Sequence, residues 1–366
     1  MSTNDPQNIQ MLVNKNDLST FKFEHSAGLT AADLSAGQVL LEVENFALTA
    51  NNITYAVAGD SMGYWQFFPA APDWGRIPVW GFARVSASEH PDVAIGDRLY
   101  GYLPMGTQLI IQAERVTEKQ LIDGSEHRAS LAPVYNQFLR VNKQADAAAD
   151  ALQMLYRPLF MTSWLLDDFL AHNEFFGAQQ VILTSASSKT SFGLAFMLAQ
   201  REGINVVGLT SAGNTDFVQR LGCYADVVSY DNITRLAADR QSVIVDMAGN
   251  GSTLAAVHNH FDKALRYSAL VGATHWSARS GAGEMAGPKP ELFFAPNHIK
   301  ARSAQWGAGG LEERFDAGWQ AFTAKVGDWV RVQNCRGEEA VGALYRTLLD
   351  GQTPPNVGFI ASVNNA

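Results

Sequence analysis

The sequence predicts a two-domain α/β protein, in which a β-rich domain precedes a doubly wound parallel sheet. Its 366 residues are roughly two or three times the length of a typical single domain, so two domains are expected. Short apolar runs broken by glycine and proline fill residues 39–140, whereas apolar strands alternate with helices from residue 181 onward. The pattern changes near residue 150, which favours a domain boundary there.

The first domain is predicted from short strand-like segments at close spacing. These segments cover residues 39–43, 78–85, 98–103 and 109–111. Many short strands separated by turn residues are typical of a barrel-like antiparallel domain. We therefore expect such a domain before residue 150.

The second domain is predicted from strands and helices in alternation. Its strands are expected at residues 181–184, 205–209, 227–228, 243–245 and 269–272. Its helices are expected at residues 145–151, 159–170, 190–200, 215–221 (capped by Asn214 and closed by Gly222) and after Ser252 as a cap. Strands this apolar, alternating with helices, indicate a parallel sheet buried on both faces. Two later helices (311–330 and 338–349) and a last strand (357–360) follow.

Composition and charge exclude several classes of protein. Apolar residues make up 47% of the chain and charged residues 17%, which excludes a disordered protein. The net charge is −9 and no long basic block occurs, so nucleic acid is not an expected partner. Two distant cysteines, Cys223 and Cys335, exclude a disulfide scaffold and a CxxC-type zinc site. Neither a signal peptide nor a long apolar span is visible, so we expect a soluble cytoplasmic protein that does not bind membranes.

A polar loop follows the first strand of the α/β part and precedes an apolar helix. A strand–loop–helix junction in this place directs backbone N–H groups and the positive end of a helix at an anion. The dinucleotide fingerprint GxGxxG and the P-loop pattern are both absent, since Ser188 replaces the last glycine of the latter. The alternatives are a polar turn that caps a buried helix, or a kinase-type ATP site. The residues predicted to hold a pyrophosphate are Ser185, Ser187, Ser188, Lys189 and Thr190.

The end of the second strand favours NADPH over NADH as the cofactor. An NAD site usually has Asp or Glu here, which binds the ribose 2′-hydroxyl. This chain instead has Thr210 and Ser211, which leave room for a 2′-phosphate and can donate hydrogen bonds to it. Because no Arg or Lys follows closely, Lys189 or another basic residue would neutralise that phosphate.

Several segments together resemble the medium-chain dehydrogenase/reductase superfamily, in its zinc-free quinone-oxidoreductase-like branch. The chain is most similar to a subfamily of unknown function that carries the Ser-Ala-Ser-Ser-Lys-Thr loop. The matching segments are Ile77–Val85, Ile95–Gly101, Phe217–Asp226, Val245–Gly249 and Ala269–Gly272.

The resemblance implies a fold and the place of the nicotinamide. It implies a GroES-like β-barrel domain at residues 1–150, completed by about 331–366, and a Rossmann-type coenzyme domain at 151–330. Thr162 and the backbone of Val271 and Gly272 would orient the nicotinamide, and the protein would be a homodimer. Zinc-dependent members have Gly-His-Glu where this chain has Gly-Phe-Ala at residues 81–83, and no ligating cysteine lies upstream. No metal is therefore expected.

The resemblance also points to catalytic residues in the segment 51–59. Tyr55 aligns without a gap with a tyrosine of quinone oxidoreductases, and a small shift brings the family's asparagine to Asn51 or Asn52. A phenol there would polarise a substrate carbonyl for hydride attack. The alternative is an ordinary half-buried tyrosine at a strand end.

An aromatic run follows this segment and predicts an apolar substrate pocket. Tyr64 and Trp65 are expected on a loop that lines the pocket, whereas Phe67 and Phe68 are better explained as core residues. The sequence thus predicts a zinc-free, NADPH-dependent oxidoreductase acting on a small carbonyl, quinone or enone. The alternative is a non-catalytic dinucleotide-binding or interaction protein that kept the fold, because serines replace the glycines of the coenzyme loop.

Overall fold

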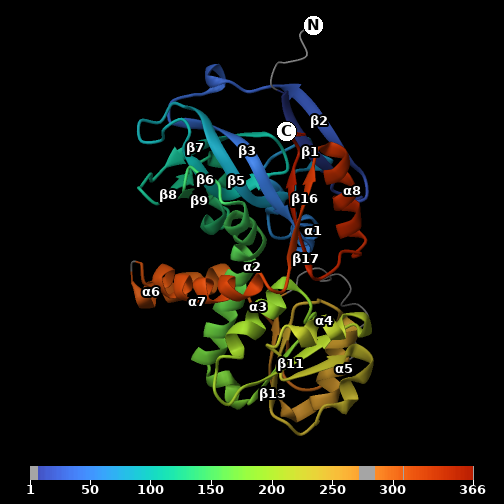
Figure 1. Cartoon of the computed structure of the whole chain (residues 1–366). Helices are drawn as coiled ribbons and strands as arrows, with labels where there is room; N and C mark the ends of the chain where they lie inside the picture. Colours follow the sequence, from blue (N-terminus) through green and yellow to red (C-terminus); the bar gives the residue numbers. More distant parts are fainter. Residues whose placement is uncertain (1–6, 272–284, 308, 366) are drawn as a thin grey trace. The chain divides into compact units, whose positions relative to one another are not determined.

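A computed structural model describes residues 7–271, 285–307 and 309–365 of the chain, which forms two compact units (Figure 1). We call Met1–Leu155 with Val332–Ala366 the barrel unit, and Tyr156–Arg331 the sheet unit. The predicted fold class, a GroES-like barrel plus a Rossmann-type parallel sheet, is confirmed by the strand pairings described next.

Six antiparallel strands close the barrel. Along the sheet they follow the order β3, β5, β6, β9, β8 and β7, and β7 pairs back onto β3. The segment after residue 331 adds β17 beside β3 and then β16 at the edge. The bounds are β3 (Gln38–Leu48), β5 (Pro78–Ser88), β6 (Arg98–Pro104), β7 (Gln108–Glu114), β8 (Gln120–Asp123), β9 (Gln137–Val141), β16 (Arg331–Arg336) and β17 (Val357–Ser362).

A second, three-stranded sheet of the barrel unit lies outside the predicted elements. It has the order β2 (Phe21–Ala27), β1 (Gln7–Asn14) and β4 (Trp74–Gly75). Strand β2 is largely exposed, and only Phe21 and Phe23 alternate with charged residues, which is too short a pattern to identify a strand. The unit also contains helices α1 (Ala50–Val57) and α8 (Glu338–Leu349), and the ring of Tyr345 on α8 packs against Phe21.

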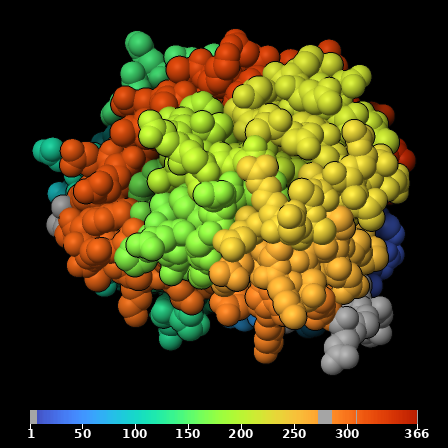
Figure 2. Space-filling view, turned by 90° about the horizontal axis from the view of Figure 1, so that it is seen from below, coloured from blue at the N-terminus to red at the C-terminus, as the bar shows by residue number. Residues whose placement is uncertain are grey.

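The described residues of the sheet unit form six parallel strands in the order β12, β11, β10, β13, β14 and β15. The chain order reverses between β10 and β13, which defines the switch point where ligands bind in open α/β sheets. Figure 2 shows the surface of this unit, coloured from green to orange along the chain. The bounds are β10 (Gln180–Leu183), β11 (Asn205–Thr210), β12 (Asp226–Ser229), β13 (Ser242–Asp246), β14 (Leu265–Leu270), β15 (Glu291–Leu292), α3 (Lys189–Leu198), α4 (Thr215–Arg220), α5 (Gly251–Phe261), α6 (Ala295–Trp306) and α7 (Gly310–Val326).

Two local predictions about helices are wrong. The stretches 145–151 and 159–170 are helical as expected, but they form one helix, α2 (Ala147–His172), which continues through Pro158, so the expected break is wrong. Helix α5 is capped by Asn250, whose side chain accepts hydrogen bonds from the amides of residues 252 and 253, and not by Ser252. The C′ position of Gly222 is confirmed by its φ of +70°.

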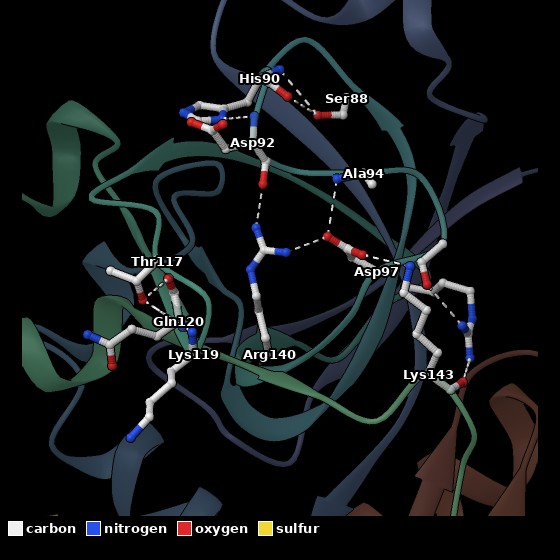
Figure 3. Close-up of polar contacts among 12 residues, drawn as sticks. Ser88, His90, Asp92, Ala94, Asp97, Thr117, Lys119, Gln120, Arg140 and Lys143 are labelled. Atoms are coloured by element: carbon white, nitrogen blue, oxygen red, sulfur yellow. Dashed lines mark hydrogen bonds and ion pairs between the residues drawn. The ribbon is translucent and has the colours of Figure 1, made fainter.

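Buried ion pairs fix the start of α2 to the barrel. Arg98 on β6 is 2% exposed and lies 2.7 Å from both Glu44 on β3 and Asp150 in the first turn of α2. Nearby, Asp97 accepts hydrogen bonds or ion pairs from Arg140 at 2.7 Å and Lys143 at 3.0 Å (Figure 3). Charged groups that are removed from water need partners of opposite charge. The Arg98 pairs therefore hold α2 against β6, and the Asp97–Arg140 pair holds β9 beside β6.

Helix α6 is attached to α2 by one carboxylate. Asp168 lies 2.8 Å from Nε2 of His298 and accepts two hydrogen bonds from the Arg302 guanidinium. Although burial raises the pKa of Asp168, the hydrogen bonds from His298 and Arg302 outweigh it and lower this pKa to about 2. No helix of the described residues is long and apolar enough to cross a membrane.

The substitution Asp168→Asn should destabilise the protein by about 1–2 kcal/mol at neutral pH. Because the folded pKa is below the unfolded one, the carboxylate stabilises the fold above about pH 4 and loses this effect as the pH falls toward about 2. Urea unfolding at about pH 7 and about pH 3 should show a smaller difference from the wild type at the lower pH. Asp328→Asn, in an exposed pair with Lys325, is the control and should change stability little. If the difference in unfolding free energy between the wild type and Asp168→Asn is the same at both pH values, the low pKa assigned to Asp168 is contradicted.

Candidate functional site

The serine-rich loop lies at the carboxyl end of β10 and leads directly into α3. Ser188 is the N-cap of α3 and accepts a hydrogen bond from the amide of Ser191 at 3.3 Å. Ser191 in turn donates to the carbonyl of Thr184 at 2.7 Å. The first turn of a helix carries N–H groups with no intrahelical acceptor, so this junction has the donors that an anion needs.

Three side chains from neighbouring loops hold the serine loop in place. The hydroxyl of Tyr230 accepts a hydrogen bond from the amide of Ser185 at 2.9 Å, and Tyr224 donates to the carbonyl of Ala186 at 2.9 Å. The side-chain amide of Asn214 donates to the Ser187 hydroxyl at 3.2 Å.

Sequence reasoning missed these three contacts. Asn214 does occupy the N-cap position of α4, but its side chain makes no capping bond and reaches the loop instead. Tyr224 follows the predicted helix at 215–221, and Tyr230 follows the predicted strand at 227–228. Their position just after these elements is the only sequence signal that could have identified them.

A buried polar node joins the two strands at the switch point. Thr184, at the end of β10, donates a 2.6 Å hydrogen bond to Asp246, at the end of β13. The Thr184 hydroxyl also accepts from the amides of Met247 at 2.8 Å and Ala248 at 3.2 Å. Burial raises the pKa of Asp246, whose side chain is 1% exposed. The node therefore fixes the edge of the sheet on which the serine loop lies.

The predicted coenzyme residues mostly lie at this same edge. Thr210 ends β11 and is fully buried, Ser211 after it is exposed, and Val271 follows β14. Gly272 lies outside the described residues. Desolvation lowers the pKa of the half-buried Lys189, in the first turn of α3, to about 8.

Thr162 lies on a helix, as expected, whereas the other candidate coenzyme residues lie near strand ends. It lies on α2, next to Ser163, which donates to the carbonyl of Thr190 at 2.7 Å. Gly193 faces this serine, and a Cβ there would lie 2.8 Å from its hydroxyl. The sequence therefore lets α2 and the start of α3 approach closely, which brings Thr162 near the serine loop.

A cluster of aromatic side chains surrounds Tyr55 in the barrel unit, and we call it the tyrosine cluster. Its members are Tyr55, Tyr64, Phe67, Phe68, Trp80, Tyr102 and Tyr135. The Tyr55 hydroxyl accepts a hydrogen bond from the Trp80 indole at 3.4 Å, and the hydroxyls of Tyr64 and Tyr135 lie 3.3 Å apart. Burial raises the pKa of Tyr55 far above its usual range, so its phenol stays protonated.

The structure changes the expected setting of several barrel residues. Tyr55 lies on helix α1 and not at a strand end, because Thr49 and Asn52 form a capping box that starts a helix there. Asn52 also donates to the carbonyl of Pro78 at 2.9 Å, and its Oδ1 accepts from the amide and the hydroxyl of Thr49, so both ends of its side-chain amide have structural partners. Tyr64 and Trp65 lie in a short 3-10 helix and not in an open loop.

The expected pocket residues separate into two environments. Trp65 is 5% exposed and packs into the main barrel core, where Cβ atoms on Gly59 and Gly75 would collide with its ring. Tyr64 belongs to the tyrosine cluster. Phe67 and Phe68 are buried, in agreement with their assignment to the core. Among the described residues, no group of three His, Cys, Asp or Glu side chains could hold a metal ion.

Solved structures with a similar fold include two that hold a nicotinamide dinucleotide. The structure of CurA from Vibrio vulnificus in complex with NADPH has 13% sequence identity and a TM-score of 0.66, and covers 98% of this chain and 100% of that one. The yhdH oxidoreductase from Salmonella enterica in complex with NADP has 14% identity and a TM-score of 0.54, with the same coverage. At this identity the likeness defines the fold.

Residues 46–354 match the family described as "Protein of unknown function (DUF2855)", so the chain belongs to this family. No curated protein matches the sequence.

The substitution Thr184→Val should destabilise the protein by about 2 kcal/mol, because it leaves the buried Asp246 carboxylate and two backbone amides without their shared partner. Thermal and denaturant unfolding measure the loss. Thr347→Val removes a hydroxyl that bonds within a helix turn on the surface, and is the control. Equal stabilities of the two variants would contradict a central role of the node.

Proposed function

We propose that this protein is an NADPH-dependent oxidoreductase that reduces a small carbonyl, quinone or enone substrate without zinc. The observation that carries the proposal is the loop of hydroxyls and helix amides at the switch point of a sheet whose solved relatives CurA and yhdH hold NADPH or NADP. Within the medium-chain dehydrogenase/reductase superfamily it would belong to the quinone-oxidoreductase-like branch. It would form a homodimer, and light scattering measures this oligomeric state.

The donor set of the loop fits a dinucleotide phosphate. Ser187, Ser188 and Thr190 offer hydroxyls at the start of α3, and Lys189 supplies a cation in the first turn. Gly208 on β11 lets the loop pack closely, since a Cβ there would lie 2.9 Å from both Ala186 and Tyr224.

The ribose end of the site would depend on hydroxyl donors. Ser211 is exposed at the end of β11, whereas Thr210 is fully buried, so Ser211 is the better candidate for the 2′-phosphate. The Tyr230 hydroxyl accepts from the Ser185 amide and keeps its own proton for a further acceptor. Thr162 and Val271 would contact the nicotinamide.

The tyrosine cluster would receive the substrate. When bound, the coenzyme supplies a hydride to the substrate. Tyr55 remains protonated because burial raises its pKa, so it donates a hydrogen bond to a carbonyl oxygen and does not act as a base. Asn52 positions this phenol through the capping box of α1. The aromatic neighbours keep water away from the carbonyl.

A non-catalytic dinucleotide-binding protein is the second candidate. Two backbone amides of the serine loop already have acceptors within the protein, which favours this second candidate. The amide of Ser185 donates to the Tyr230 hydroxyl, and the amide of Ser188 donates to the carbonyl of Ser185. Binding of NADPH without oxidation by any quinone or enone would support this second candidate.

NADPH binding should weaken as the pH rises through about 8, because Lys189 loses its proton there. Calorimetric titration should give a nearly constant Kd below this pH. Lys189→Gln should weaken binding about tenfold at neutral pH and remove the pH dependence. Lys189→Arg keeps the charge and should keep the affinity at alkaline pH. Binding that none of these variants changes would exclude Lys189 from the site.

Tyr55→Phe should reduce kcat for quinone or enone reduction about 10²-fold, because one hydrogen bond to the developing oxyanion is lost. NADPH affinity should stay the same, since Tyr55 belongs to the barrel unit and the coenzyme residues to the sheet unit. Stopped-flow absorbance of NADPH measures both the kcat and the affinity for NADPH. An unchanged kcat would remove Tyr55 from the mechanism.

A further inference from the structure

Residues 129–135 of the barrel unit cover the tyrosine cluster, and we call them the lid segment. They follow the short 3-10 helix η3 (Glu126–Arg128) and include most of a second one, η4 (Pro133–Asn136). Two of their side chains, Leu131 and Tyr135, are half-buried and pack on the cluster. The lid segment is therefore the part of the connection between β8 and β9 that touches the cluster.

The ring of Tyr135 covers much of the cluster. Its centroid lies between 4.8 and 6.4 Å from the centroids of five cluster rings, which are those of Tyr55, Tyr64, Phe67, Trp80 and Tyr102. Tyr55 itself is only 6% exposed. A substrate can therefore reach the Tyr55 hydroxyl only if side chains around this tyrosine move.

The backbone hydrogen bonds of the lid segment are local. The amides of Ala129, Leu131 and Tyr135 each donate to the carbonyl three residues earlier in the chain, at 3.0 to 3.1 Å. None of residues 129–135 pairs with a described strand, since they lie between the end of β8 and the start of β9. The segment can therefore move as one unit without breaking a strand ladder.

Both ends of the lid segment are fixed to the barrel. Arg128 is 1% exposed, pairs with Asp123 at 3.0 Å, and places its guanidinium carbon 4.8 Å from the Phe68 ring. Asn136 is also buried, and its side-chain amide donates to the Arg128 carbonyl at 3.4 Å, which joins the two ends. Compact loops whose ends lie close together are often functional. Any motion of the segment therefore begins between these two fixed residues.

Few polar contacts hold the lid segment closed. The hydroxyls of Tyr64 and Tyr135 lie 3.3 Å apart, which is longer than a usual hydrogen bond between hydroxyl groups. At the base, Nη1 of Arg128 and Oδ1 of Asn136 are buried without a hydrogen-bond partner among the described residues. Such atoms are unfavourable, and an open segment would let water reach them. The apolar contacts of Leu131 and Tyr135 are therefore the main contribution that keeps the segment closed.

We propose that residues 129–135 form a hinged lid, which swings out between Arg128 and Asn136 and admits the substrate to Tyr55. The inference rests on the proposed function, in which the tyrosine cluster receives the substrate. Opening moves Leu131 and Tyr135 outward, so an aliphatic and an aromatic side chain line the entrance. Such an entrance favours uncharged substrates over anionic ones, and closure afterwards excludes water from the reaction.

The test measures how fast N-phenyl-1-naphthylamine, an uncharged dye that fluoresces in apolar surroundings, enters the full-length protein without NADPH. If the lid must open first, the stopped-flow rate constant of binding reaches a limit at high dye concentration. Leu131→Ala and Tyr135→Ala should each raise this limiting rate at least about tenfold, because they remove the apolar contacts that keep the lid closed. Val134→Ala is the matched control, because this half-buried lid residue is not among the described side chains that pack on the cluster.

A milder variant keeps the test decisive even if Tyr135→Ala does not fold. Tyr135→Phe keeps the ring and loses only the bond to the Tyr64 hydroxyl, so it should raise the limiting rate about twofold to threefold. A wild-type rate that rises in proportion to dye concentration would overturn the proposal. So would a limiting rate that none of the three substitutions changes, or the absence of any dye binding.

The dye experiment involves neither the coenzyme nor turnover, so its result is independent of the proposed function. If the lid limits dye entry but no quinone is reduced, the lid stands and the reductase proposal fails. If quinones are reduced but the lid does not limit dye entry, the lid proposal fails alone.

Discussion

The hydrogen bond between Thr184 and Asp246 is the contact on which the sheet unit depends. It joins the ends of β10 and β13 at 2.6 Å, at the point where the strand order reverses. The serine loop, α3 and the turn after β13 all start from these two residues. Because both side chains are buried, the contact is shielded from water and gains strength from the low dielectric. The conformation of the serine loop thus depends on this contact between two strands of the sheet.

The barrel unit follows a different principle, in which glycines allow close packing and paired charges set the register. A Cβ on Gly101 would lie 2.4 Å from the Phe138 ring, and a Cβ on Gly81 would lie 2.4 Å from the carbonyl of Asn45. Arg98 is buried between Glu44 and Asp150, so the barrel wall and helix α2 share one ion-pair network. These constraints fix β5 and β6, the strands that carry Trp80 and Tyr102.

Local sequence patterns were enough for most elements, and tertiary contacts account for what they missed. The helix at Glu338–Leu349 and the strand that includes 78–85 follow from apolar periodicity, which acts over a few residues. The sheet β2–β1–β4 is held by pairing between distant segments, and its outer strand β2 has only two large apolar residues in alternation, Phe21 and Phe23. Asn214 satisfies a local capping rule, yet its side chain bonds to a loop 27 residues away. The convergence of Tyr55 with Tyr102 and Tyr135 depends on three elements that only the closed barrel brings together.

The left-handed backbone of Ser185, with φ of +46°, has a consequence for the kinetics of ligand binding. A serine in this conformation carries about 1–2 kcal/mol of strain, which the hydrogen bond from its amide to Tyr230 helps to offset. The loop is therefore ordered in advance, and an arriving anion does not have to fold it. Association at this loop should be a single fast step governed by diffusion and charge, without a slow phase of rearrangement.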